Sequence, residues 1–416
     1  MITTWRRRAA AVASLFALAA GTLVAIATSS ATAMPELRWT GTWASALTAA
    51  PAQNTGGSLV GFNNQSVRMV VHTSVGGQKV RIRLSNAFGA DAITVGRATV
   101  GLPVAAGSPD LVAGSVRTLT FSGSESVLIV KGSDVVSDPV DFEVEGLQDL
   151  AVSLFFPTPT GQTTWHWTSR ETAWIYDGDR AADTSGSGFA RTRTSFYFLA
   201  GVDVASHFAS GSVVVLGDSI SDGFMNTFDA NHRWPDELAK RIVQTMPDVG
   251  DPGVLNESLS GNQVTRDGLN FAGVGTSALA RLDTDVFGQT GVRAVIIELG
   301  VNDIHISSDS PERIITGLRQ LTTQLHEKGI QVLVCTIGPF EGYPTWTPDK
   351  EVVRAAVNEF LRGSHNEFDT LVDMDAVFRD PAAPTKMRVE FDSGDHIHPN
   401  DTGASALAAA VPLWTL

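Results

Sequence analysis

The sequence predicts an α/β fold preceded by an antiparallel β-sandwich domain. Between Trp39 and Phe156, short apolar stretches recur and are separated by Gly, Ser, Asp and Pro. This rhythm is typical of antiparallel sandwiches. Beyond residue 206, apolar stretches alternate with segments of helical period. That alternation is typical of a parallel sheet covered by helices.

The first half contains the predicted antiparallel strands. Residues 66–73 and 79–85 have strand patterns, and Val75–Gln78 between them suits a hairpin turn. The segment 177–187 is rich in Gly, Asp and Ser, so we expect a surface loop or linker. A strand at 196–204 would end this half. Further strands are expected at 92–100, 116–121, 127–130 and 150–156.

The second half supplies the predicted parallel sheet. Its strand candidates are short and apolar, so we expect them to be buried on both faces. Pro311 and Glu312 suit the start of a helix, and Gly329 suits its end. The strands are expected at 213–216, 253–256, 294–299, 331–337 and 370–373, and the helices near 234–245, 276–287, 311–328, 349–362 and 402–410.

Composition and charge exclude some functions. The chain has 416 residues and a formal net charge of −14, which argues against nucleic-acid binding and against docking on anionic membranes. A single cysteine, Cys335, excludes an intramolecular disulfide, and its apolar surroundings in the sequence predict a buried, inert thiol.

The N-terminus has the pattern of a signal peptide. Met1–Arg8 is basic, Ala9–Ala27 is apolar, and Ala31–Ala33 is an A-x-A cleavage site. We therefore expect residues 1–33 to be removed near Ala33 and the protein to be secreted. An uncleaved anchor is the alternative, and the export route, Sec or twin-arginine, stays open.

Four polar blocks follow the predicted strands or precede the last helix. They are Gly217–Ser219, Asn256–Asn262, Gly300–Asp303 and Asp395–Asn400. Each block is ordinary alone, but functional residues collect at the carboxyl ends of the strands in such sheets. Their joint occurrence predicts one site at this edge.

These blocks resemble those of the SGNH hydrolases, also called GDSL esterases and lipases. The matching residues are Gly217–Ile220, Gly261, Gly300–Asp303 and Asp395–His398, within about 210–416. The resemblance implies a flavodoxin-like three-layer α/β/α hydrolase domain at 206–416. It extends to a secreted subgroup with an N-terminal β-rich domain, expected here, with its linker, at 34–205.

Acyl transfer needs a nucleophile, a base and donors to an oxyanion. Ser219 is the expected nucleophile, His398 its base, and Asp395 the acid that orients His398. His396 and Asp392 are the competing residues for the last two roles.

The resemblance also implies an oxyanion hole. Its donors would be the backbone amides of Ser219 and Gly261 and the side-chain amide of Asn302. Two neighbouring acids, Asp218 and Asp303, are expected to accept hydrogen bonds that organise the loops. For His305, lining of the pocket and exposure to solvent both stay open.

These residues predict a secreted serine esterase that acts on short acyl groups, such as acetyl esters of carbohydrates. A lipase or phospholipase for longer chains is one alternative. A non-catalytic carbohydrate- or surface-binding protein is another, in which Trp165–Trp167 would stack on sugars or simply pack. We expect no metal, no cofactor, no nucleic acid and no membrane span after cleavage. The oligomeric state stays open.

Overall fold

The structure, a computed structural model, describes residues 36–50, 60–208, 210–245, 250–268, 274–364 and 366–416. The predicted signal peptide at 1–33 lies outside these residues. The described residues from Glu36 to Leu416 form one compact unit. Within these ranges, no helix has the length and apolar character needed to span a membrane.

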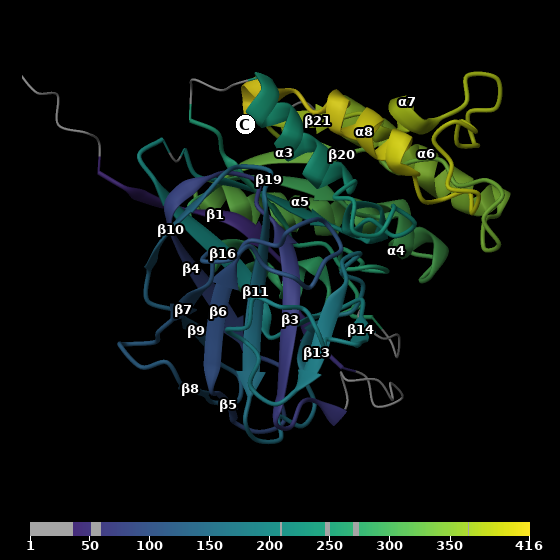
Figure 1. Ribbon diagram of the computed structural model, residues 1–416. Helices are drawn as coiled ribbons and strands as arrows, with labels where there is room; N and C mark the ends of the chain where they lie inside the picture. Colours follow the sequence, from purple (N-terminus) through teal and green to yellow (C-terminus); the bar gives the residue numbers. More distant parts are fainter. Residues whose placement is uncertain (1–35, 51–59, 209, 246–249, 269–273, 365) are drawn as a thin grey trace, which may run out of the picture. The chain divides into compact units, whose positions relative to one another are not determined.

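Two antiparallel sheets pack face to face in the first half (Figure 1). One has the order β1-β16-β4-β10, with β9 also on β4, and the other has the order β14-β13-β3-β11-β6-β7. Alternate residues of β3 (Val67, Met69) and β4 (Val80, Ile82, Leu84) are fully buried in one shared core. This confirms the predicted antiparallel, β-rich first half, because one face of each strand points inward.

The antiparallel strands have these bounds: Arg38–Ala44 (β1), Thr48–Ala49 (β2), Gln65–His72 (β3), Gly77–Ser85 (β4), Ile93–Val95 (β5), Arg97–Gly101 (β6), Arg117–Leu119 (β7), Val127–Ile129 (β8), Asp134–Val136 (β9), Val140–Val144 (β10), Asp149–Phe156 (β11), Thr164–His166 (β12), Ala173–Asp177 (β13), Arg191–Arg193 (β14), Phe196–Tyr197 (β15) and Leu199–Ser206 (β16).

The second half is a parallel sheet flanked by helices (Figure 1). Its strands are Ser212–Gly217 (β17), Gly253–Asn256 (β18), Val292–Glu298 (β19), Gln331–Cys335 (β20) and Thr370–Val372 (β21), in the order β18-β17-β19-β20-β21. This 2-1-3-4-5 order is that of flavodoxin-like folds, so the predicted fold class is confirmed. The helices are Ser219–Asp222 (α2), Trp234–Thr245 (α3), Val301–His305 (α4), Pro311–Glu327 (α5), Pro348–Gly363 (α6), Met374–Phe378 (α7) and Asp401–Ala410 (α8).

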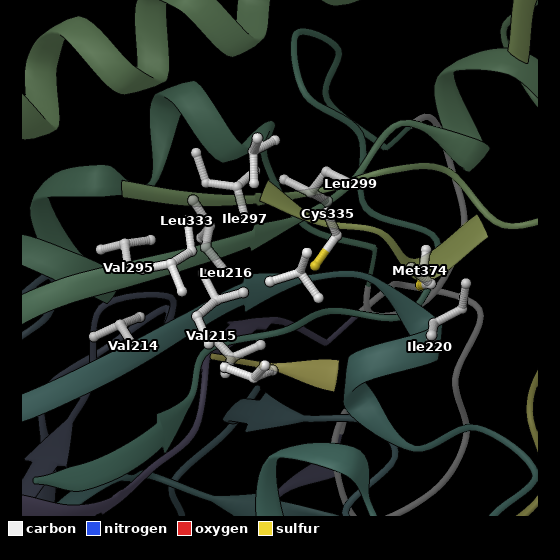
Figure 2. Close-up of a cluster of buried hydrophobic side chains, with 14 of the residues drawn as sticks. Val214, Val215, Leu216, Ile220, Val295, Ile297, Leu299, Leu333, Cys335 and Met374 are labelled. Carbon is white, nitrogen blue, oxygen red and sulfur yellow. The ribbon is translucent and has the colours of Figure 1, made fainter. Parts of the chain in front are cut away.

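The core of this sheet explains why its strands are apolar without alternation. All four residues of Val213–Leu216 are fully buried, so both faces of β17 are covered. Figure 2 shows their neighbours on β19 and β20 gathered with Ile220 and Met374 in one cluster. Cys335 belongs to this cluster and its thiol is free, as predicted. Burial raises the pKa of the Cys335 thiol well above its usual range.

Two predicted elements are interrupted. The strand predicted at 92–100 is divided into β5 and β6 at Gly96, and β5 pairs with β8 in a separate sheet. The helix predicted at 276–287 was wrong: a 3₁₀ turn (Ala278–Ala280) precedes a π-helical turn (Asp283–Phe287). Between the turns, the buried Arg281 points inward and donates to the carbonyls of Gly217 and Glu257. The continuous helix is interrupted where that side chain satisfies the ends of two strands.

Two hydrogen bonds link the antiparallel region to the parallel sheet. The hydroxyl of Thr40 donates to the Gly211 carbonyl at 2.8 Å, and the amide of Val254 donates to the Ser74 hydroxyl at 2.9 Å. Both bonds join groups more than 170 positions apart. The antiparallel strands end with β16 at Ser206, and the parallel sheet begins with β17 at Ser212.

We predict that Gly253→Ala destabilises the protein by about 1–3 kcal/mol, the usual cost of overpacking a tight site. A Cβ atom at Gly253 would lie 1.9 Å from the carbonyl oxygen of Gly41, so β1 and β18 would have to separate. Denaturant unfolding of the full chain measures this loss. Gly363→Ala is the control, since a Cβ atom there meets nothing within 4 Å, and equal stability of the two variants would contradict the prediction.

Candidate active site

A strand, a tight turn and a short helix present Ser219. The residue follows β17 and begins α2, and its neighbour Asp218 caps this helix by accepting the Ile220 amide at 3.0 Å. Gly223 ends the helix in the left-handed region, with φ of 84°. Ser219 is 8% exposed. The hydroxyl is therefore held at the carboxyl end of β17, where such sheets bind ligands.

Three predicted residues come together at this hydroxyl. His398 Nε2 lies 2.8 Å from Ser219 Oγ, and His398 Nδ1 lies 2.6 Å from Asp395 Oδ2. Asp395 Oδ1 accepts the amide of His398 at 3.0 Å. Partial burial alone would raise the pKa of Asp395, but the hydrogen bonds from His398 and from nearby amides hold it well below its usual range. Asp395 is therefore ionised at neutral pH.

The competing residues form a separate pair. His396 Nδ1 lies 2.6 Å from Asp392 Oδ2, and about half of the His396 side chain is exposed. The structure thus brings His398, and not His396, to Ser219. Phe224 packs against the His398 ring with centroids 4.8 Å apart, which helps to hold that ring in place.

The two predicted backbone donors lie on neighbouring loops. Neither the amide of Ser219 nor that of Gly261 donates to another residue in the described part of the chain. Gly261 has φ of +84°, a conformation that a side chain disfavours. Its predecessor Ser260 is tied to α2, because the Ser260 amide and hydroxyl both donate to Asp222 Oδ2, at 3.1 and 2.6 Å.

Asn302, the third predicted donor, is buried and already engaged. Its amide nitrogen donates to Asp218 Oδ2 at 2.9 Å and to the Asn262 carbonyl at 3.0 Å. These two bonds use both hydrogens of the amide. His305 Nε2 lies 2.8 Å from the Asn302 carbonyl oxygen. Burial, together with Lys350, lowers the pKa of His305 to about 4, so a neutral imidazole donates this bond at neutral pH.

Asp218 and Asp303 organise the loops. Besides Asn302, Asp218 accepts the Ile220 amide, and both oxygens of Asp303 lie 3.1 Å from the Val264 amide. Burial raises the pKa of both carboxyls to about 7. Below them, burial also raises the pKa of Glu298 well above its usual range. Glu298 was not among the predicted residues, because a single acid at the end of an apolar strand carries no local signal.

The two tryptophans of Trp165–Trp167 lie in different surroundings. Trp165 is buried in the antiparallel core, whereas Trp167 is partly exposed. Between them His166 is buried and contacts Asp222 of α2, with Nε2 and Oδ1 2.9 Å apart. This contact was not predicted, because its two residues lie 56 positions apart and no local pattern links them. Among the described residues, no cluster of three His, Cys, Asp or Glu side chains could hold a metal ion.

An open parallel sheet with a Ser–His–Asp relay at its carboxyl edge defines a serine hydrolase. Residues 215–406 match the GDSL-like lipase/acylhydrolase family. This part of the chain belongs to that family, and the protein is a serine ester hydrolase of the GDSL type.

Two solved structures each match about half of this chain. A carbohydrate acetylesterase family member from Sinorhizobium meliloti is 18% identical, over 48% of this chain and 94% of its own, with a TM-score of 0.38. A mutant of an acetyl-xylooligosaccharide esterase from Geobacillus is 19% identical, over 49% of this chain and 92% of its own, with a TM-score of 0.39. No curated protein matches the sequence.

We predict that Asp395→Asn lowers kcat for an ester by about 10³–10⁴-fold, as loss of the orienting acid does in serine proteases. An amide at this position cannot hold His398 with Nδ1 protonated and Nε2 free to accept the Ser219 proton. Steady-state hydrolysis of p-nitrophenyl acetate measures the loss.

Asp392→Asn is the matched control, because Asp392 makes the same type of bond to His396. It should retain kcat within a few fold. If the two variants lose activity equally, the Asp395–His398 bond has no special part in catalysis.

Proposed function

We propose that the protein is a secreted esterase that hydrolyses carboxylic esters of short acyl groups through an acyl-Ser219 intermediate. The observation that carries the proposal is the continuous relay from Ser219 Oγ through His398 to Asp395. Acetyl esters of carbohydrates are the substrate class that we favour. The pattern of residues 1–33 supports export, and N-terminal sequencing of protein recovered from culture medium would test cleavage near Ala33.

The proposed reaction has two halves. His398 Nε2 takes the proton of Ser219 as its oxygen bonds to the ester carbonyl carbon, and then delivers that proton to the leaving alcohol as the C–O bond breaks. Water then attacks the acyl-serine with the same base, which releases the acid and restores the Ser219 hydroxyl. Asp395 stays ionised and holds Nδ1–H throughout.

The tetrahedral intermediates carry a negative oxygen that needs donors. The amides of Ser219 and Gly261 are available for it. In this proposal the ester oxygen competes with the Asn262 carbonyl for one hydrogen of Asn302, while the bond to Asp218 keeps the amide in place. The neutral His305 orients the same amide from its carbonyl side.

The surroundings of the relay support a small, polar substrate. His305 contacts the ring of Tyr343, with centroids 5.2 Å apart, and lies 3.3 Å from the Thr345 hydroxyl. Burial, together with the nearby charge of Asp395, raises the pKa of the Tyr343 phenol. Polar and aromatic groups of this kind suit sugar hydroxyls better than a long acyl chain.

We predict that Ser219→Ala reduces hydrolysis of p-nitrophenyl acetate by at least about 10³-fold while leaving the unfolding temperature nearly unchanged. Loss of a serine nucleophile in a triad has effects of this order or larger. Ser364→Ala, at the end of α6, is the control and should retain full activity. Unchanged turnover in Ser219→Ala would rule out the acyl-serine route.

A chain-length series on the full protein separates the substrate classes. We predict that kcat/KM falls by about tenfold or more between p-nitrophenyl butyrate and p-nitrophenyl decanoate, since each tenfold loss needs only about 1.4 kcal/mol. Higher activity on decanoate would favour a lipase. The carbohydrate substrate is then tested by measuring the acetate that wild type and Ser219→Ala release from acetylated xylan. Tight polysaccharide binding with no ester cleaved would favour the binding-protein alternative.

We predict that Asn302→Ala lowers kcat by about 10²–10³-fold, the usual effect of removing one oxyanion donor. KM for p-nitrophenyl acetate should change far less, because the donor acts on the intermediate rather than on bound ester. A decrease below tenfold would mean that the two backbone amides suffice and that Asn302 only supports the loop.

A further inference from the structure

The carboxylate of Asp222 joins three parts of the molecule immediately behind Ser219. Asp222 ends α2, the helix that Ser219 begins, and it is buried. Its Oδ2 atom accepts the amide and hydroxyl of Ser260 and, at 3.1 Å, the hydroxyl of Thr168. Its Oδ1 atom lies 2.9 Å from His166 Nε2. One carboxylate therefore holds the serine helix, the Gly261 loop and the antiparallel region together.

His166 makes this contact as a cation. Its Nδ1 atom lies 2.8 Å from the carbonyl oxygen of Ala46, and its Nε2 atom faces Asp222, so both ring nitrogens must donate. Burial alone would lower the pKa of His166, but Asp222 and the two hydrogen bonds raise it above its usual value, against a small opposing effect of Arg233. His166 and Asp222 thus form a buried ion pair.

The other charged groups at this junction leave the pair intact. Arg233 is bonded to Asp236 and to the Ser169 carbonyl. Burial raises the pKa of Glu171 to about 9, so this carboxyl is neutral at pH 7. His166 is therefore the charged partner that bonds Asp222 directly. A cavity of about 30 Å³ adjoins the pair, and its mixed polar and apolar lining includes His72 and Asn256.

The two ends of this network are the proposed oxyanion donors. Ser219 lies three positions before Asp222 on the same short helix, and Gly261 directly follows Ser260. A shift of Asp222 would change the spacing between the Ser219 and Gly261 amides. Displacements of about 1 Å in such sites cost on the order of 10²-fold in rate.

We propose that His166, a residue of the antiparallel region, is a positioning residue that sets the oxyanion hole through Asp222 and Ser260. This inference rests on the proposed ester hydrolysis. It gives the antiparallel region a part in the reaction: its buried imidazolium holds Asp222, and Asp222 holds both loops at the spacing that the tetrahedral intermediate requires.

The test compares His166→Gln with Thr172→Val in the full chain. Thr172 is the matched control, since its hydroxyl also bonds across the junction, but to Asp229, at 2.7 Å, rather than to Asp222 or Ser260. Diethyl p-nitrophenyl phosphate, which phosphorylates an active serine with release of p-nitrophenolate, counts the working sites in each sample. Rates on p-nitrophenyl acetate are then expressed per titrated site.

We expect His166→Gln to lower kcat per site by about 10–100-fold, part of the effect of losing one oxyanion donor. KM should stay within about threefold, because binding of the ester ground state does not depend on the hole. Thr172→Val should keep kcat per site within twofold. Equal kcat in the two variants, or a loss in His166→Gln that appears only in KM or in the number of sites, overturns the proposal.

Ser260→Ala gives a second test should His166→Gln fold poorly. It removes the 2.6 Å bond to Asp222 from the hydrolase side and leaves every contact of His166. We expect Ser260→Ala to lower kcat. The double variant with His166→Gln should lose less kcat than the product of the two single fold-decreases, because both substitutions act through the Asp222 carboxylate. Full kcat in Ser260→Ala, or strictly multiplicative losses, contradicts the inference.

These results separate the two proposals. A wild type that cleaves no ester and is not labelled by the phosphate ester refutes the proposed function. An active wild type whose His166 variant behaves like Thr172→Val refutes only the positioning role.

Discussion

The hydrogen bond between the Ser219 hydroxyl and the His398 imidazole joins residues 179 positions apart. It exists because β17 and the loop before α8 meet at the same edge of a parallel sheet, and the fully buried strands Val213–Leu216 and Val295–Ile297 make that edge rigid. Asp218 caps the helix, Asp395 holds His398, and Asp303 holds the Val264 amide. The bonds of Asp218 and Asp395 limit movement of Ser219 and His398, and the bond of Asp303 fixes a neighbouring loop.

Acids with opposite environments surround this bond. Asp395 accepts several donors and stays ionised, whereas Asp218, Asp303 and Glu298 lie deeper, where burial raises their pKa values. A protonated carboxyl below the site avoids placing several negative charges beside the oxygen that becomes negative in the intermediate. Asp395 keeps its charge, and in the proposed reaction that charge stabilises the imidazolium formed when His398 takes the serine proton.

Local patterns predicted what depends on neighbours in the chain. The five parallel strands, most of their helices and the four polar blocks are visible as periodicity and as turn residues. The interruption of the helix at Arg281 was not visible in the sequence, because it depends on carbonyls at Gly217 and Glu257 that only the folded sheet places nearby. His166 was missed for the same reason. A histidine between two tryptophans gives no sign in the sequence that it will bond to a carboxylate 56 positions later.

The contact between Gly41 and Gly253 bears on how the chain folds. A strand from residues 38–44 pairs with β16 near residue 200 and also packs against β18. Such pairings over long sequence separations form slowly, since the chain must close large loops before they stabilise it. The first strand therefore cannot reach its final place until more than two hundred further residues are available. Final packing of the first strand consequently needs both the antiparallel region and the parallel sheet.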